Sequence, residues 1–112
     1  MEQPRTGTGN RRAAIRRKPK SIQVRCRRGW MGVGPDIALT LRSISETGAL
    51  LLVTDPLKPA EEVELEFDAS FFPKPLRVRA NVVRAKIVPG NVYCVGVKFQ
   101  QAISYADFNR LT

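Results

Sequence analysis

Apolar residues occupy every second position in several short segments between residues 22 and 99. In the segment 22–28, Ile22, Val24 and Cys26 alternate with polar or basic residues. Because successive side chains of a β-strand point to opposite faces of a sheet, this period of two predicts a strand with one buried face. At 112 residues the chain is expected to form one domain around one modest core.

Turns that contain glycine or proline separate six segments with the pattern of a strand. We expect strands at 22–28, 37–41, 49–54, 62–68, 76–88 and 92–99. The segment 49–54 is apolar almost throughout, which predicts burial on both faces or a place at the centre of a barrel. The alternation within 76–88 changes phase, so we expect a β-bulge near Asn81–Val83.

A short helix is expected at 104–111, because Ser104 can cap its N-terminus and Asp107 follows three residues later. On that helix Tyr105, Phe108 and Leu111 would share one face and cover an open end of the barrel. Six short strands and one helix predict a mainly β fold, a six-stranded antiparallel β-barrel with a short C-terminal helix.

Positive charge is concentrated at the start of the chain. The net charge is +9, and residues 1–28 contain ten arginines or lysines against the single acidic residue Glu2. Residues 1–20 are polar and lack aromatics, so they cannot bury enough apolar surface to order alone. We therefore expect a flexible basic tail at 1–20, a barrel at 21–112 and an anionic partner.

Three further features concern the loops and the surface. Trp30 and Met31 lie in a glycine-rich loop and fit either an exposed contact patch or, as we favour, packing over the edge of the core. Phe71 and Phe72 are expected to close one end of the barrel. The alternating acidic residues of 62–68 predict a solvated acidic face.

The composition argues against several classes of function. The chain has no histidine, and Cys26 and Cys94 form no CxxC motif or metal-ligand cluster, so no metal or other cofactor is expected. The carboxylates show no catalytic pairing, so we do not expect an enzyme. Neither a membrane-length apolar run nor a secretory signal is present, which predicts a cytoplasmic protein with reduced, core-packed cysteines.

The segment 43–48, Ser-Ile-Ser-Glu-Thr-Gly, separates the second and third expected strands. Small hydroxyls compete well for backbone hydrogen bonds in turns, and glycine allows close approach of the backbone to another group. The spacing of Ser43, Ser45 and Gly48 fits an ordinary turn, but it can also present hydroxyls and backbone N–H groups at one rim of the sheet.

Three short motifs follow one another along the chain: Arg-x-x-x-Arg at Arg12-Ala13-Ala14-Ile15-Arg16, Ser-x-Ser-x-x-Gly at 43–48, and Gly-Val-x-Phe at Gly96-Val97-Lys98-Phe99 in a late strand. In this order they resemble the motifs of the PilZ domain, the bacterial receptor module for the second messenger cyclic di-GMP. The segment 43–48 matches that family's Asp/Asn-x-Ser-x-x-Gly pattern except at its first position. The resemblance covers residues 11–112 and implies a non-catalytic nucleotide-binding protein.

The resemblance also implies a set of ligand contacts. Arg12 and Arg16 would clamp cyclic di-GMP, with Arg11 and Arg17 as neighbours that substitute for them or add charge. Ser45 and Gly48 would line the floor of the site on the barrel. The planar guanidinium group grips phosphate or the guanine edge and stacks on bases, and Arg84 is a further candidate for such stacking. Binding would order the tail and change the interaction with an effector protein that the sequence does not identify.

Ser43 departs from the family pattern, which has Asp or Asn at this position. A carboxylate can accept two hydrogen bonds from the guanine edge, whereas a hydroxyl accepts fewer. A divergent PilZ-like module that docks proteins without binding the nucleotide therefore stays open beside the receptor. The positive charge of the tail leaves a second alternative open, a nucleic-acid-binding barrel with a basic arm. The absence of aromatic residues from 1–28 disfavours the latter.

Overall fold

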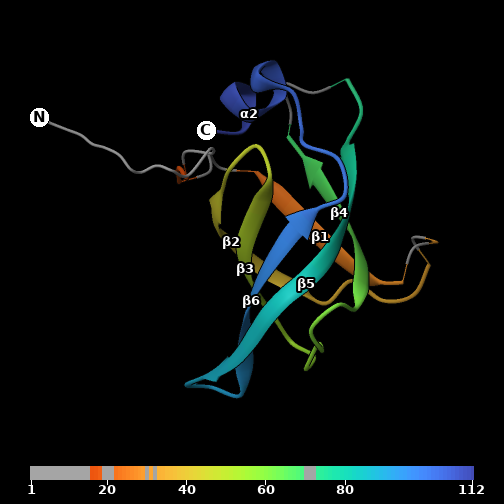
Figure 1. Cartoon of the computed structure of the whole chain (residues 1–112), viewed down its shortest axis with the longest axis vertical. Coiled ribbons are helices and arrows are strands. Elements are labelled where there is room, and N and C mark those ends of the chain that lie inside the picture. The colour runs from red at the N-terminus through yellow and green to blue at the C-terminus, as the bar shows by residue number, and fades with distance from the viewer. Residues whose placement is uncertain (1–15, 19–21, 30, 32, 70–72) are drawn as a thin grey trace, which may run out of the picture.

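The computed structural model describes residues 16–18, 22–29, 31, 33–69 and 73–112. Six antiparallel strands form one sheet in the order β1-β4-β5-β6-β3-β2, which curls into an open barrel (Figure 1). Helix α2, Tyr105–Leu111, covers one end of the barrel (Figure 1). The strands are β1 Gln23–Arg28, β2 Ala38–Ile44, β3 Gly48–Val53, β4 Glu62–Asp68, β5 Leu76–Val88 and β6 Val92–Phe99. The predicted fold class, with its six strands and C-terminal helix, is confirmed.

Alternation explains the core. Val63, Leu65 and Phe67 of β4 are fully buried, while the acidic residues between them face outward. The rings of Phe67 and Phe99 meet edge to face at 6.5 Å inside the barrel. Helix α2 begins as predicted, with the Ser104 hydroxyl accepting a hydrogen bond from the Asp107 backbone N–H at 3.1 Å.

The face of α2 that covers the barrel is narrower than expected. Phe108 and Leu111 are buried at the end of the core, but Tyr105 remains 59% exposed. Met31 is 65% exposed, so the expectation that it folds back over the core is wrong. Trp30, Phe71 and Phe72 lie outside the described residues.

Strand β3 is buried on one face rather than two. Ala49, Leu51 and Val53 are fully buried, whereas Leu50 and Leu52 are half-buried on the outer face. The barrel is a single layer of sheet, and its outer face is covered only where side chains from neighbouring strands lie over it. The apolar outer face of β3 is therefore a surface on which a ligand or another segment can pack.

The acidic face of β4 is ion-paired rather than simply solvated. β4 lies between β1 and β5, and the register places Glu66 between Arg25 and Arg77. Arg27 contacts the Glu66 carboxylate at 3.1 Å, and Arg25 contacts Asp68 at 3.5 Å. We call these alternating charges on the outer faces of β1, β4 and β5 the charge ladder. Cross-strand pairs of opposite charge stabilise an antiparallel sheet modestly.

The expected bulge in β5 is confirmed. The register with β6 shifts between Val82 and Arg84. Before the shift, the inward residues are Val78, Ala80 and Val82; after it, Arg84 pairs with Gly96 on the outer face. Without the extra residue, Arg84 would have the same parity as Val82 and would point into the core.

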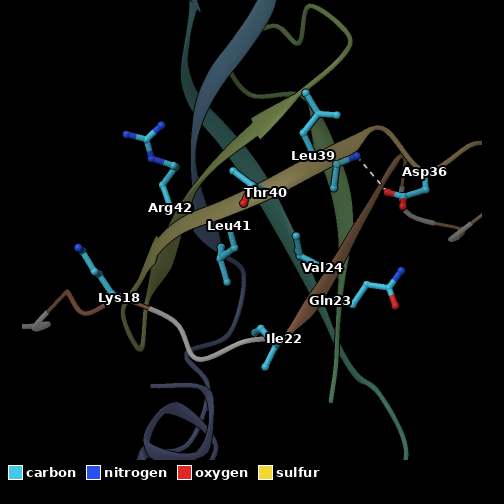
Figure 2. Close-up of a pocket in the computed structure, with 10 residues that line it drawn as sticks. Lys18, Ile22, Gln23, Val24, Asp36, Leu39, Thr40, Leu41 and Arg42 are labelled. Carbon is cyan, nitrogen blue, oxygen red and sulfur yellow. Dashed lines mark hydrogen bonds between the residues drawn. The ribbon is translucent and has the colours of Figure 1, made fainter. Parts of the chain in front are cut away.

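The barrel remains open between β1 and β2, the two ends of the sheet. At one end of this opening the Ile37 backbone N–H donates to the Cys26 carbonyl at 2.8 Å. At the other end a single antiparallel bridge joins Arg17 to Ile44. Figure 2 shows the opening between these contacts, with Val24 and Leu41 on its two sides. No described helix is long and apolar enough to cross a membrane.

The two cysteines differ in environment, and this difference generates a prediction. Burial raises the pKa of the Cys26 thiol to about 12, and the carboxylates of Asp36 and Glu61 add to the effect. Cys94 is only half-buried, on the outer face of β6. Since the thiolate is the nucleophile, an alkylating reagent at pH 8 should modify Cys94 and leave Cys26 unmodified, as checked by peptide mass spectrometry.

Unfolding the protein in guanidinium chloride is the control, because it should make both thiols reactive. Modification of Cys26 in the folded protein, at a rate equal to that of Cys94, would contradict the described burial.

Candidate functional site

A pocket of about 300 Å³ lies on the outer face of the sheet over β3, β6 and β5. It brings together three of the residues that the sequence singled out, Arg16, Gly48 and Arg84. Its other lining residues are Thr47, Val83, Gly96, Val97 and Lys98. The pocket thus joins one residue of the Arg-x-x-x-Arg motif, one of the Ser-x-Ser-x-x-Gly motif and two of Gly-Val-x-Phe in a single location.

Arg84 lies across Gly96, its partner on the neighbouring strand. A Cβ atom added at Gly96 would be 3.6 Å from both Cγ and Nε of Arg84. Gly96 is buried although it faces outward, because the arginine side chain covers it. Because Gly96 has no side chain, the guanidinium end of the Arg84 side chain can lie close to the backbone of the sheet.

A row of outward-facing residues crosses the sheet at this level. Ser43 pairs with Leu50, Leu50 with Gly96, and Gly96 with Arg84. The Cδ1 atom of Leu50 would be 4.0 Å from a Cβ atom at Gly96, so Leu50 forms an apolar surface next to Arg84. Ser43 does not line the pocket, but it occupies the end of this row on β2.

Ser45 serves the turn rather than the pocket. Its side chain is 2% exposed, and its hydroxyl oxygen accepts hydrogen bonds from the backbone N–H groups of Thr47 at 3.2 Å and Gly48 at 3.1 Å. The Ser45 N–H donates to the Gly48 carbonyl at 2.8 Å. The hydroxyl that the motif would offer to a ligand is thus occupied in closing the turn between β2 and β3.

Gly48 is required by close packing of two strands. A Cβ atom at this position would clash with the carbonyl oxygen of Val97 on β6. The same turn is fastened on its other side, because Phe99 and Ile103 donate their N–H groups to the carbonyls of Thr47 at 2.8 Å and Glu46 at 2.9 Å. Gly48 therefore belongs to the pocket wall and also allows β3 to approach β6.

The arginines of the basic segment divide among several places. Arg16 lines the pocket, whereas Arg17 lies on α2, with its guanidinium 4.9 Å from the centre of the Phe108 ring. Arg11 and Arg12 lie outside the described residues. The pocket consequently contains the second arginine of the Arg-x-x-x-Arg motif. The next residue, Arg17, is already paired with Ile44 at the end of β2.

The pocket is electropositive. Arg16, Arg84 and Lys98 line it, and within the described ranges no acidic side chain forms an ion pair with any of the three. The arginines of the charge ladder differ, because carboxylates of β4 neutralise them. Unpaired cations around a pocket with an apolar wall suit an anionic ligand that has flat apolar surfaces.

Lys98 and Leu50 were missed by sequence reasoning. Lys98 has the same parity as Gly96 on β6, so the alternation of that strand already places it on the outer face. Leu50 was hidden in the continuous apolar run of β3, where the alternation of faces cannot be seen. The pairing of β3 with β6 and of β6 with β5 brings Leu50 to the level of Arg84 and Lys98 to the same pocket.

A larger opening of about 780 Å³ lies between β1 and β2 (Figure 2). Lys18 and Arg42 stand at its rim, and Ile22, Val24 and Leu41 form its apolar part. None of the predicted site residues that the structure describes lines it. Among the described residues there is also no group of three or more side chains suited to hold a metal ion.

Comparison with known structures supports the fold. The solved structure of the K. pneumonia MrkH–c-di-GMP complex is similar, with a TM-score of 0.58 and 17% sequence identity. The similarity covers 91% of this chain and 49% of that one, so this chain spans about half of the other protein's length. A search of curated proteins finds no significant match.

A family model gives the assignment itself. The model of the PilZ domain matches residues 10–112, which include the basic segment around Arg16, the turn at Ser45 and the whole described barrel. The three motifs that meet at the pocket are within this range. The chain belongs to the PilZ domain family.

Proposed function

We propose that this protein is a non-catalytic receptor that binds cyclic di-GMP at the pocket formed by Arg16, Gly48 and Arg84. Membership of the PilZ family and similarity in fold to a protein solved with c-di-GMP support this proposal. The observation that carries it is the convergence of unpaired cations from three separate segments of the chain on one face of the sheet.

The chemistry of the pocket fits the ligand. Cyclic di-GMP carries two phosphates and two guanine bases, which require cationic groups and flat surfaces at short range. Arg84 lies across Gly96, and a base would stack on the guanidinium that it exposes there. Leu50 continues that surface toward β2, and Arg16 and Lys98, which line the same pocket, would neutralise phosphate.

Arg12 completes the site in this proposal. It precedes Arg16 by four residues, and the part of the basic tail before Arg16 would close over the ligand and become ordered. An ordered tail presents a different surface to an effector protein, so the receptor acts by changing a protein contact and not by catalysis. The cytoplasmic location inferred from the sequence belongs to this proposal.

The first test compares three single substitutions by calorimetric titration with cyclic di-GMP. Arg16→Ala and Arg84→Ala should each weaken binding by about 10- to 100-fold, because each removes a charge-assisted or stacking contact of roughly 1–3 kcal/mol. Lys86→Ala is the matched control: Lys86 lies two residues after Arg84 on the same face of β5 and is absent from the pocket.

Lys86→Ala should change the affinity by less than about 2-fold, as is usual for a surface residue without a contact. GTP and cyclic di-AMP test selectivity in the same titrations. If all three variants bind as tightly as the original protein, cyclic di-GMP does not bind at this pocket.

Ser43→Asp tests whether the departure from the family motif weakens the site. Asp at this end of the row can accept two hydrogen bonds from a guanine edge, so the affinity for cyclic di-GMP should rise by about 10- to 100-fold. Ser43→Ala is the control and should bind like the original protein or slightly more weakly. The measurement is again the dissociation constant from titration.

The result also separates the two main functions. If neither the original protein nor Ser43→Asp binds cyclic di-GMP, the chain is a PilZ-like module that docks proteins without this nucleotide. The divergence of Ser43 is the observation that favours this second function.

A further inference from the structure

We propose that Arg17 is a positioning residue that attaches the segment 16–18 to α2 and β2 and thereby holds Arg16 at the pocket. This inference rests on the proposed function for its effect on the ligand. It also assigns α2 as the element that responds to occupancy of the pocket. Arg17 itself would touch no part of the ligand.

The backbone of Arg17 adds one residue to the free edge of β2. Its N–H donates to the Ile44 carbonyl at 2.9 Å, and its carbonyl accepts from the Ile44 N–H at 3.0 Å. This reciprocal pair is the pattern of an antiparallel strand. Ile44 is fully buried, so the segment is attached to a rigid part of the barrel at this point.

The extended backbone at Arg17 sends neighbouring side chains to opposite sides. Arg16 lines the pocket, and Lys18 lines the opening between β1 and β2. Arg17 points the other way, toward α2. The position of Arg16 therefore follows from how Arg17 is held, because a twist of the segment would move both side chains together.

The side chain of Arg17 makes three contacts with α2 and its C-cap. The guanidinium lies 4.9 Å from the centre of the Phe108 ring and donates to the Asn109 side-chain oxygen at 3.2 Å. A longer contact of 3.5 Å reaches the hydroxyl of Thr112. Phe108 is buried at the end of the core, so the cation rests on a fixed aromatic surface.

The helix is connected to the pocket by a second route. The segment before α2 donates from Ile103 to the Glu46 carbonyl, and Glu46 and Thr47 belong to the turn that precedes Gly48. Figure 1 shows α2 at the same end of the barrel as this turn. The helix is therefore connected both to Arg17, next to Arg16, and, through Ile103, to the turn next to Gly48. A ligand held between Arg16 and Gly48 would contact both of these segments.

The experiment removes the partners of Arg17 on α2 and its C-cap, so that every cation of the protein is kept. Asn109→Ala combined with Thr112→Val removes both hydrogen-bond acceptors of the Arg17 guanidinium. This pair should weaken cyclic di-GMP binding by about 3- to 10-fold, the effect of losing one exposed and one partly buried hydrogen bond. In an Arg16→Ala background the same pair should have almost no effect, because the group being positioned is gone.

Salt dependence separates a positioning role from direct contact. Arg16→Ala should reduce the slope of log affinity against log salt concentration, since a cation that meets phosphate is removed. The Asn109→Ala, Thr112→Val pair should leave that slope unchanged. An equal loss of affinity in both backgrounds, or no loss in either, would overturn the role of Arg17 in binding.

A measurement on the free protein keeps this inference distinct from the proposed function. The Ile44 amide is bonded to the Arg17 carbonyl, so Arg17→Ala and the Asn109→Ala, Thr112→Val pair should both accelerate its hydrogen exchange by about 3-fold or more. If the original protein does not bind cyclic di-GMP, the proposed function fails. Unchanged exchange of Ile44 would instead show that Arg17 does not hold the segment.

Discussion

The register shift between Val82 and Arg84 determines which face of the sheet carries the candidate site. Before the shift, even-numbered residues of β5 build the core; after it, they face outward. One extra residue thus takes Arg84 out of the core, where an unpaired cation would be prohibitively costly, and lays it across Gly96. The same strand serves the charge ladder with its first half and the pocket with its second.

Two residues of the motif 43–48, Ser45 and Gly48, mainly shape the backbone and offer few groups to a ligand. Ser45 closes the turn from inside, and Gly48 permits the contact between β3 and β6. These residues place the wall of the pocket without offering it many polar groups. In the structure the candidate ligand contacts belong instead to long side chains whose positions are set by this frame, Arg16, Arg84 and Lys98.

Periodicity was enough to predict most of the fold. The alternation in β4, the phase change in β5 and the cap at Ser104 each have one physical interpretation, and all three agree with the structure. The position of individual side chains relative to distant strands was harder to predict from the sequence. The family resemblance assigned Arg16 to the ligand clamp and Arg17 to a supporting place beside it, yet adjacent residues of an extended segment face opposite ways. Strand pairing, which no local pattern determines, brought Leu50 and Lys98 to the site.

The charge ladder has a consequence for how an anion would approach the protein. Because β4 carboxylates compensate the arginines of β1 and β5 within a few ångströms, that side of the barrel has little field beyond the Debye length of about 8 Å at physiological ionic strength. Arg16, Arg84 and Lys98, which line the pocket, form no ion pair with a described carboxylate. Diffusing anions are therefore attracted more strongly to the pocket than to the charge ladder, and their encounter rate falls as ionic strength rises.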